Sequence, residues 1–205
     1  MEKDEASLSS EPNQLWLGLA LAGGLCWSGA IALLFMADLH RELDPFTPQR
    51  VLFYVLTIAA GLFTFVPLQL HLGLPRLALQ GVGGSSLLLY TLAFVPPPTD
   101  WLFSLPELPV YLLLIVALFW TSTAIALPFL YALGQRIFKQ RVLKGDVRRA
   151  KRQAYEIGTL FACTTTLAGL RVLTWVSFLL LILILVMVEL LFLSRIEAGG
   201  AGRTL

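Results

Sequence analysis

Charged residues are scarce in this chain of 205 residues: they make up 14% of it, against about 25% in typical soluble globular proteins. Residues of the set AVILMFWYC reach 57%, and the mean hydropathy is +0.78. A water-soluble fold of this size needs more polar side chains than these to cover its surface. The composition therefore excludes an ordinary soluble domain and predicts an integral membrane protein.

Residues that carry covalent or metal chemistry are scarce as well. Cys26 and Cys163 each lie inside an apolar run without CxxC spacing, which indicates neither a disulfide framework nor a redox motif. His40 and His71 belong to no HExxH motif and no Cys/His cluster. The sequence also lacks a Ser/His/Asp set, paired intramembrane carboxylates and a glycine-rich phosphate loop. We therefore expect no catalytic residues, no metal site and no enzyme activity, and the sequence names no cofactor.

The net charge of +2 is too small to indicate nucleic acid as a partner. At the N-terminus, residues 1–13 hold one lysine against four acidic residues, so they lack the basic region of a secretory signal. We expect them to form a flexible polar tail. The apolar run that follows is then expected to stay in the protein.

Four long uncharged runs predict the first part of a transmembrane bundle. They cover residues 15–37, 51–72, 77–95 and 110–133. The first has 23 residues, about 35 Å as a helix, which is enough to cross a hydrocarbon core of about 30 Å. Prolines and charges separate the runs, most clearly at Pro96-Pro97-Pro98. The predicted fold is an all-α polytopic membrane bundle of about five transmembrane helices, with six as the alternative.

Positive charge is concentrated in one stretch, which we predict to be a basic amphipathic cytoplasmic segment at residues 134–157. Its basic residues are Arg136, Lys139, Arg141, Lys144, Arg148, Arg149, Lys151 and Arg152. Such a run marks the cytoplasmic side of a membrane. It can also bind anionic lipid headgroups, at about 1 kcal/mol per basic residue close to the surface. Docking of an acidic partner protein is the alternative role.

The C-terminal apolar stretch leaves two topologies open. Residues 157–194 carry only Arg171 and Glu189 as charges, and 38 helical residues would be about 57 Å long, too long for one span. The favoured topology has an interfacial helix at residues 147–170, a break near Gly169 and a fifth span at residues 172–193. The alternative has two short spans with a turn near residues 171–175. No Pro, Asn or Asp marks that turn, which favours the first topology.

The predicted organisation is a tail at 1–13, four spans within 14–133, the basic segment at 134–157, the last helices within 158–195 and a flexible tail at 196–205. The distribution of Lys and Arg places the basic segment and the N-terminus in the cytoplasm. The favoured topology puts 10 positive charges inside and 4 outside, and the alternative gives 12 and 2, which favours the alternative. A bacterial inner membrane or an equivalent membrane is the expected location.

Three polar residues of the apolar part are candidate site residues. Arg171 is expected at the membrane boundary, where it reaches lipid phosphates, and pairing with a buried acid is its functional alternative. Glu189 is expected to reach the nearer interface, and a proton or cation site is its alternative. His71 is expected to face the headgroups together with Gln69, and its speculative functional role is ligation of a haem or pigment.

Small residues recur every four positions and predict faces for close helix packing. The pattern comprises Ala20, Gly24, Ser28 and Ala32 in the first span, Gly81 and Ser85 in the third, and Gly158, Ala162 and Thr166 after the basic run. These faces are expected to pack either inside the bundle or against another subunit.

Together these features favour a non-catalytic accessory, scaffold or assembly subunit of a larger membrane complex. Its expected partners are the lipid bilayer, anionic lipid headgroups and other membrane protein subunits. A small transporter or channel component that uses Arg171, Glu189 or the Gln69/His71 pair is the second hypothesis. A pigment- or haem-holding subunit that uses His71 is the third.

Overall fold

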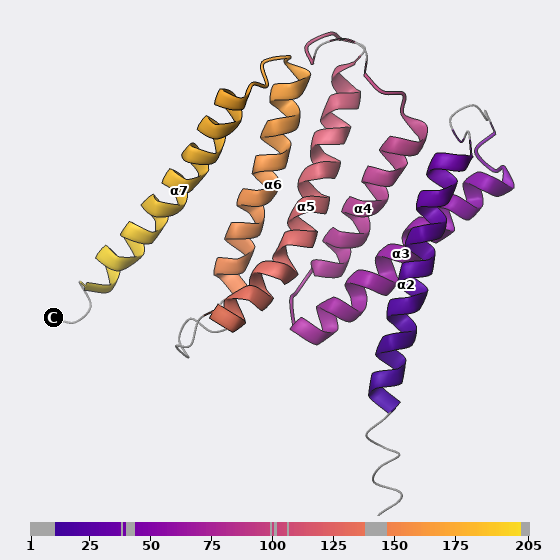
Figure 1. Ribbon diagram of the computed structural model, residues 1–205, viewed down its shortest axis with the longest axis horizontal. Helices are drawn as coiled ribbons and strands as arrows, with labels where there is room; N and C mark the ends of the chain where they lie inside the picture. The colour runs from indigo at the N-terminus through magenta and orange to yellow at the C-terminus, as the bar shows by residue number, and fades with distance from the viewer. Residues whose placement is uncertain are drawn as a thin grey trace, which may run out of the picture.

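The computed structural model describes residues 11–37, 39, 44–98, 100, 102–105, 107–137 and 147–201, and the structural statements below concern these residues. Their secondary structure is helical throughout, which confirms the predicted all-α class (Figure 1). The helices are α2 (Glu11–Met36), α3 (Pro48–Leu72), α4 (Leu77–Phe94), α5 (Leu108–Ile137), α6 (Val147–Gly169) and α7 (Trp175–Ala201).

Five of these helices are long and apolar enough to cross a membrane. The qualifying segments are Trp16–Met36, Pro48–Leu72, Leu77–Phe94, Leu108–Arg136 and Trp175–Phe192. The chain is therefore a membrane-embedded helical protein. α6 is not among the five because its N-terminal half is charged and its C-terminal half holds four threonines.

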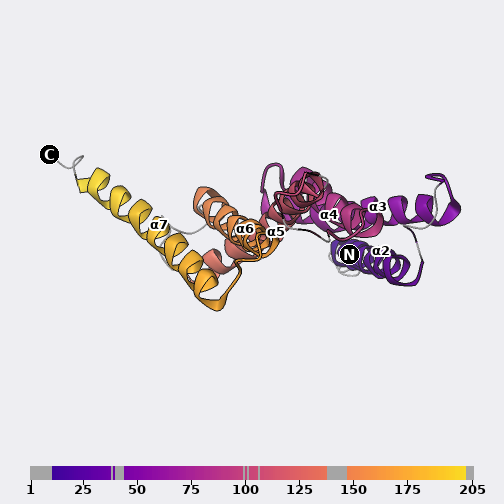
Figure 2. The ribbon, with the colours of Figure 1, turned by 90° about the horizontal axis from the view of Figure 1, so that it is seen from above.

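The helices stand in an open row. Extensive contacts join helices that follow one another in sequence, from α2 with α3 to α5 with α6, whereas α7 touches α6 over a short stretch only. Viewed from above, α2 and α3 form one end of the row and α7 is splayed away at the other (Figure 2). The outer faces of α2 and α7 are thus left uncovered by the rest of the described chain.

Glycines bring the middle helices close together. A Cβ atom on Gly84 of α4 would lie 2.8 Å from the backbone nitrogen of Thr121 in α5. Gly81 lies under the ring of Phe65 from α3, and Ser85 is buried with its hydroxyl donating to the Gly81 carbonyl at 2.7 Å. The small residues predicted for this span therefore pack inside the bundle.

The C-terminal stretch combines features of both predicted topologies. Its helices begin and end as in the favoured topology, but α6 runs in the direction expected of the alternative. α6 ends at Gly169, at the expected break. It does not lie across one end of the bundle, however, but runs antiparallel beside α5 (Figure 1). Its small residues Ala150, Ala154 and Gly158 are buried there, because they let α6 approach α5 closely. α6 and α7 therefore form a hairpin, as in the alternative topology, while the number of candidate spans is the five of the favoured one.

The turn of this hairpin uses none of the usual turn residues. Arg171 takes the left-handed conformation, with φ 57°, and the Val172 amide donates back to the Leu167 carbonyl at 3.0 Å. Thr174 then caps α7, since its hydroxyl oxygen accepts a hydrogen bond from the Ser177 amide at 3.1 Å. This position favours glycine but holds an arginine, so the turn has no signal in the sequence.

Candidate functional site

Three charged side chains meet where α6 contacts α7, and we name Arg152, Glu156 and Glu189 the α6–α7 charge cluster. Nη2 of Arg152 donates to Oε1 of Glu189 at 2.6 Å. Nε of Arg152 lies 4.0 Å from Oε1 of Glu156. Glu156 and Glu189 also line the same groove. One guanidinium group is therefore shared by two carboxyl groups.

The helical hairpin sets this geometry. Arg152 and Glu156 are one turn apart on α6, so they share a face. Glu189 lies 18 residues after Arg171, and Arg152 lies 19 residues before it. Residues at equal distances from a tight turn lie at the same level in antiparallel helices. The turn at Arg171 therefore brings Glu189 level with Arg152.

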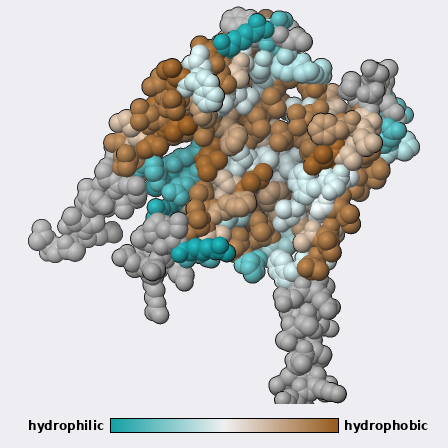
Figure 3. All heavy atoms as spheres, in the orientation of Figure 1, coloured by the Kyte–Doolittle hydropathy of each residue, from teal (hydrophilic) through white to brown (hydrophobic). Residues whose placement is uncertain are grey.

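The cluster is bordered by Gln153 and by apolar residues of α6 and α7. The side chains of Arg152 and Glu189 are 26% and 18% exposed, and the guanidinium carbon of Arg152 lies 5.4 Å from the ring centre of Phe192. Each carboxyl group has one buried oxygen that accepts no hydrogen bond from a described residue. Figure 3 shows hydrophilic atoms gathered between α6 and α7 within a hydrophobic surface.

A groove of about 290 Å³ continues from the cluster along the α6–α7 contact, lined by Glu156 and Glu189 and by apolar residues such as Leu160 and Ile182. Glu189 lies near the end of the apolar span Trp175–Phe192, where an unpaired charge next to lipid still has a cost. Pairing with Arg152 lowers this cost for Glu189. The cluster can therefore hold α7 against α6.

The other candidate polar residues lie apart from this cluster. Arg171 is exposed in the turn at the far end of α6, so Glu189 pairs with Arg152 and not with Arg171. Gln69 has a structural role, because its Oε1 accepts a hydrogen bond from the Ala78 amide at 2.8 Å and joins α3 to α4. His71 is exposed, and its ring lies 5.4 Å from that of Trp16. Cofactor binding by His71 remains a prediction.

The small-residue face predicted on α2 points away from the bundle. Its members Ala20, Gly24, Ser28 and Ala32 are all exposed. A Cβ atom on Gly24 would meet nothing within 4 Å. The neighbouring face of α2 contacts α3 instead, where Nε1 of Trp27 donates to Oγ1 of Thr64 at 3.0 Å. Of the two uses expected for this face, packing inside the described bundle does not occur.

The basic residues of the predicted docking segment divide into three groups. Arg136 and Arg148 are exposed, and Arg149, Lys151 and Arg152 are half-buried on α6. Lys139, Arg141 and Lys144 lie outside the described residues. Arg152 pairs with Glu189 and lies beside Glu156. Its role is therefore inside the protein and differs from the expected docking at the surface.

Paired carboxyl groups are not expected from the sequence, yet Glu156 and Glu189 both lie beside Arg152. The spacing of Arg152, Glu156 and Glu189 about a turn near Arg171 was the available signal.

The chain matches no family model, no curated protein and no solved structure. Its function is therefore argued from its own geometry.

Proposed function

We propose that this chain is a non-catalytic subunit of a larger membrane complex, in which its end helices contact helices of partner subunits. The observation that carries this proposal is the open row of helices. In the α7 segment Trp175–Phe192, 0% of the residues are buried by the rest of the chain. Membrane helices associate through close packing, and α7 has little of it here. A partner helix along the α6–α7 groove would supply such packing.

The opposite end of the row supports the same proposal. α2 presents a face of small residues, with open space above Gly24, on the side away from α3. Faces of this kind allow the backbone of a second helix to approach closely. α7 at the other end exposes large apolar side chains such as Leu183 and Leu190 instead, so both ends of the row offer an apolar face to a partner.

The directions of the helices support an orientation in which the start of α2 and the end of α7 both face the cytoplasm. α2 begins and α7 ends on the same side (Figure 1). Among the described residues, the helix ends on that side carry Arg76, Arg136, Arg148, Arg149, Lys151 and Arg152, and the opposite ends carry Arg50 and Arg171. This asymmetry is typical of cytoplasmic loops and tails, for example in a bacterial inner membrane. α6 then crosses as a sixth helix, between α5 and α7.

Site-specific photocrosslinking in native membranes tests the proposal. A photoreactive residue at Gly24 on α2 or at Leu183 on α7 is expected to form adducts with the same partner polypeptides that copurify in fixed ratio. Val116 and Leu62, 43% and 44% exposed on the middle helices, serve as lipid-facing controls. Lipid adducts alone at both end positions would contradict the proposal.

The charge cluster supports a second candidate function, that of a small transporter or channel component. Ionisable groups within membrane helices often mark ion or proton pathways, and Glu156 and Glu189 share one arginine. The two candidate functions predict different results for the substitution Glu189→Gln. In a transporter this variant loses proton or ion flux in liposomes while assembly is unchanged, whereas a subunit of the proposed kind supports no such flux before the substitution.

A further inference from the structure

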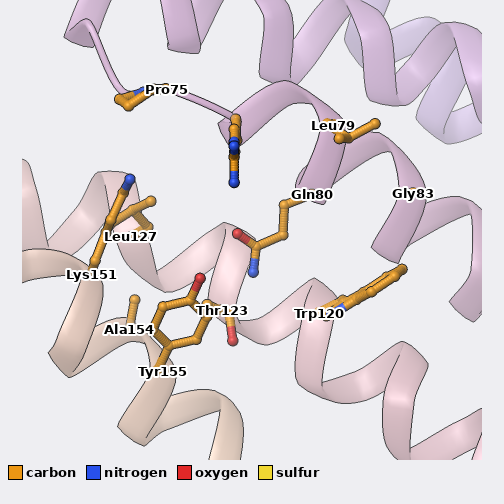
Figure 4. Close-up of a pocket in the computed structure, with 11 residues that line it drawn as sticks. Pro75, Leu79, Gln80, Gly83, Trp120, Thr123, Leu127, Lys151, Ala154 and Tyr155 are labelled. Carbon is orange, nitrogen blue, oxygen red and sulfur yellow. The ribbon is translucent and has the colours of Figure 1, made fainter.

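A pocket lies over α5 between α4 and α6, away from the charge cluster, and we name it the α4–α6 pocket (Figure 4). Its volume of about 450 Å³ falls within the range of about 300 to 1,000 Å³ that is typical of small-molecule sites. Residues of all three helices and of the turn before α4 line it. The proposed subunit role does not account for this pocket.

One end of the pocket is positively charged. Arg76 precedes α4, and Lys151 lies in the second turn of α6, so two separate helices bring a cation to the same space. Among the described residues neither side chain has an ion-pair partner. Arg76 lies at the N-terminal end of α4, and the N-terminal end of a helix favours an anion.

The other end of the pocket is apolar and open. Leu79 and Trp120 line it and are 77% and 44% exposed. A Cβ atom on Gly83, which also lines it, would meet nothing within 4 Å. Gln80 and the hydroxyl of Tyr155 lie between Lys151 and Trp120 (Figure 4). The pocket thus changes from cationic through polar to apolar along its length.

We propose that the α4–α6 pocket binds an anionic phospholipid of the surrounding membrane. The phosphate group lies between Arg76 and Lys151, and one acyl chain lies along Leu79, Gly83 and Trp120. Both cations are near the loop end of their helices, where headgroups lie, and the apolar part runs into the membrane layer, where acyl chains lie. Gln80 and Tyr155 can donate hydrogen bonds to the ester oxygens between them.

Native mass spectrometry of the full chain in detergent tests the charged end. Phosphatidylglycerol is expected to stay bound in preference to phosphatidylcholine with the same acyl chains. Arg76→Gln and Lys151→Gln are each expected to weaken phosphatidylglycerol binding about fivefold. Arg50→Gln removes a charge from the first turn of α3, outside the pocket, so it is the control and is expected to leave binding unchanged.

Filling the open end tests the acyl chain site. Gly83→Leu is expected to weaken phosphatidylglycerol binding about tenfold, the loss expected when one or two methylene contacts are displaced. Gly134→Leu is the control, because this helical glycine also has open space around it and lies outside the pocket. The lipid-free melting temperature checks that both variants fold.

Three results would overturn the proposal. They are equal retention of the two lipids, unchanged binding in all three pocket variants, and displacement of phosphatidylglycerol by glycerol phosphate at similar concentration. The last result would assign the pocket to a soluble phosphate compound. None of them bears on the subunit proposal, which rests on α2 and α7.

Discussion

Replacing Glu189 with arginine is expected to release α7 from α6, and exchanging Glu189 and Arg152 with each other is expected to restore the contact. In Glu189→Arg two guanidinium groups face one carboxyl group. In Arg152→Glu three carboxyl groups face one another. The double exchange again holds two carboxyl groups and one guanidinium group in the same space. Rescue by the exchange therefore separates charge pairing from other effects of the two substitutions.

The expected loss in each single variant is about 3 kcal/mol. Breaking a buried ion pair costs about 3 to 5 kcal/mol because a charge is left without its partner. The side chains of this pair are 26% and 18% exposed, which places the effect at the lower end of that range. Few other contacts hold α7 against α6, so little remains to offset the loss.

Electron paramagnetic resonance distances between α6 and α7 measure this effect. Spin labels at Phe161 and Leu183, both exposed, are placed in a chain whose Cys26 and Cys163 are replaced by alanine. A narrow distance distribution is expected for the unaltered pair and for the exchange, and a broad one for each single variant. Arg171→Asn is the control, since asparagine tolerates the left-handed turn. Narrow distributions in both single variants would show that the cluster does not hold α7.

Gly158→Leu is expected to separate α6 from α5. A Cβ atom on Gly158 would collide with the hydroxyl of Thr123 and lie 3.0 Å from the carbonyl oxygen of Phe119. That hydroxyl cannot easily move, because it donates to the same carbonyl at 2.6 Å. Forcing extra atoms into a packed contact costs about 1 to 3 kcal/mol, and more where backbone is the obstacle.

Thermal unfolding in detergent measures the effect of Gly158→Leu, and a decrease of several degrees in Tm is expected. Thr159→Leu is the matched control. Thr159 is half-buried, and its hydroxyl bonds only to the Tyr155 carbonyl of its own helix, at 2.8 Å. It is expected to change Tm little. An unchanged Tm in Gly158→Leu would mean that α5 and α6 do not pack as described.

The membrane helices could be predicted because long uncharged runs bounded by prolines and charges have few other interpretations. α6 was harder, since its charges indicate a surface helix. Its position is set by Ala150, Ala154 and Gly158, which recur every four residues and fit against α5. Only part of that series was recognised from the sequence, and the part that was missed lies among the basic residues.

The charge cluster was not predicted, because the turn on which it depends carries no Pro, Asn or Asp and was only the alternative of two topologies. Once Arg171 adopts the left-handed conformation and Thr174 caps α7, Arg152 and Glu189 become level. The small-residue face of α2 was found by its spacing. Trp27 and its hydrogen bond to Thr64 decide which face of α2 contacts α3. The spacing of small residues does not show which of the two faces packs against α3.

Extraction of the native particle in a mild detergent, followed by its mass, composition and absorption spectrum, tests the subunit proposal most directly. The open row of helices, uncovered at α2 and α7, predicts a particle in which this chain is present in fixed ratio with other membrane polypeptides. A chain that runs alone, or only with copies of itself and without pigment, would contradict the proposal and favour the transport function of the charge cluster.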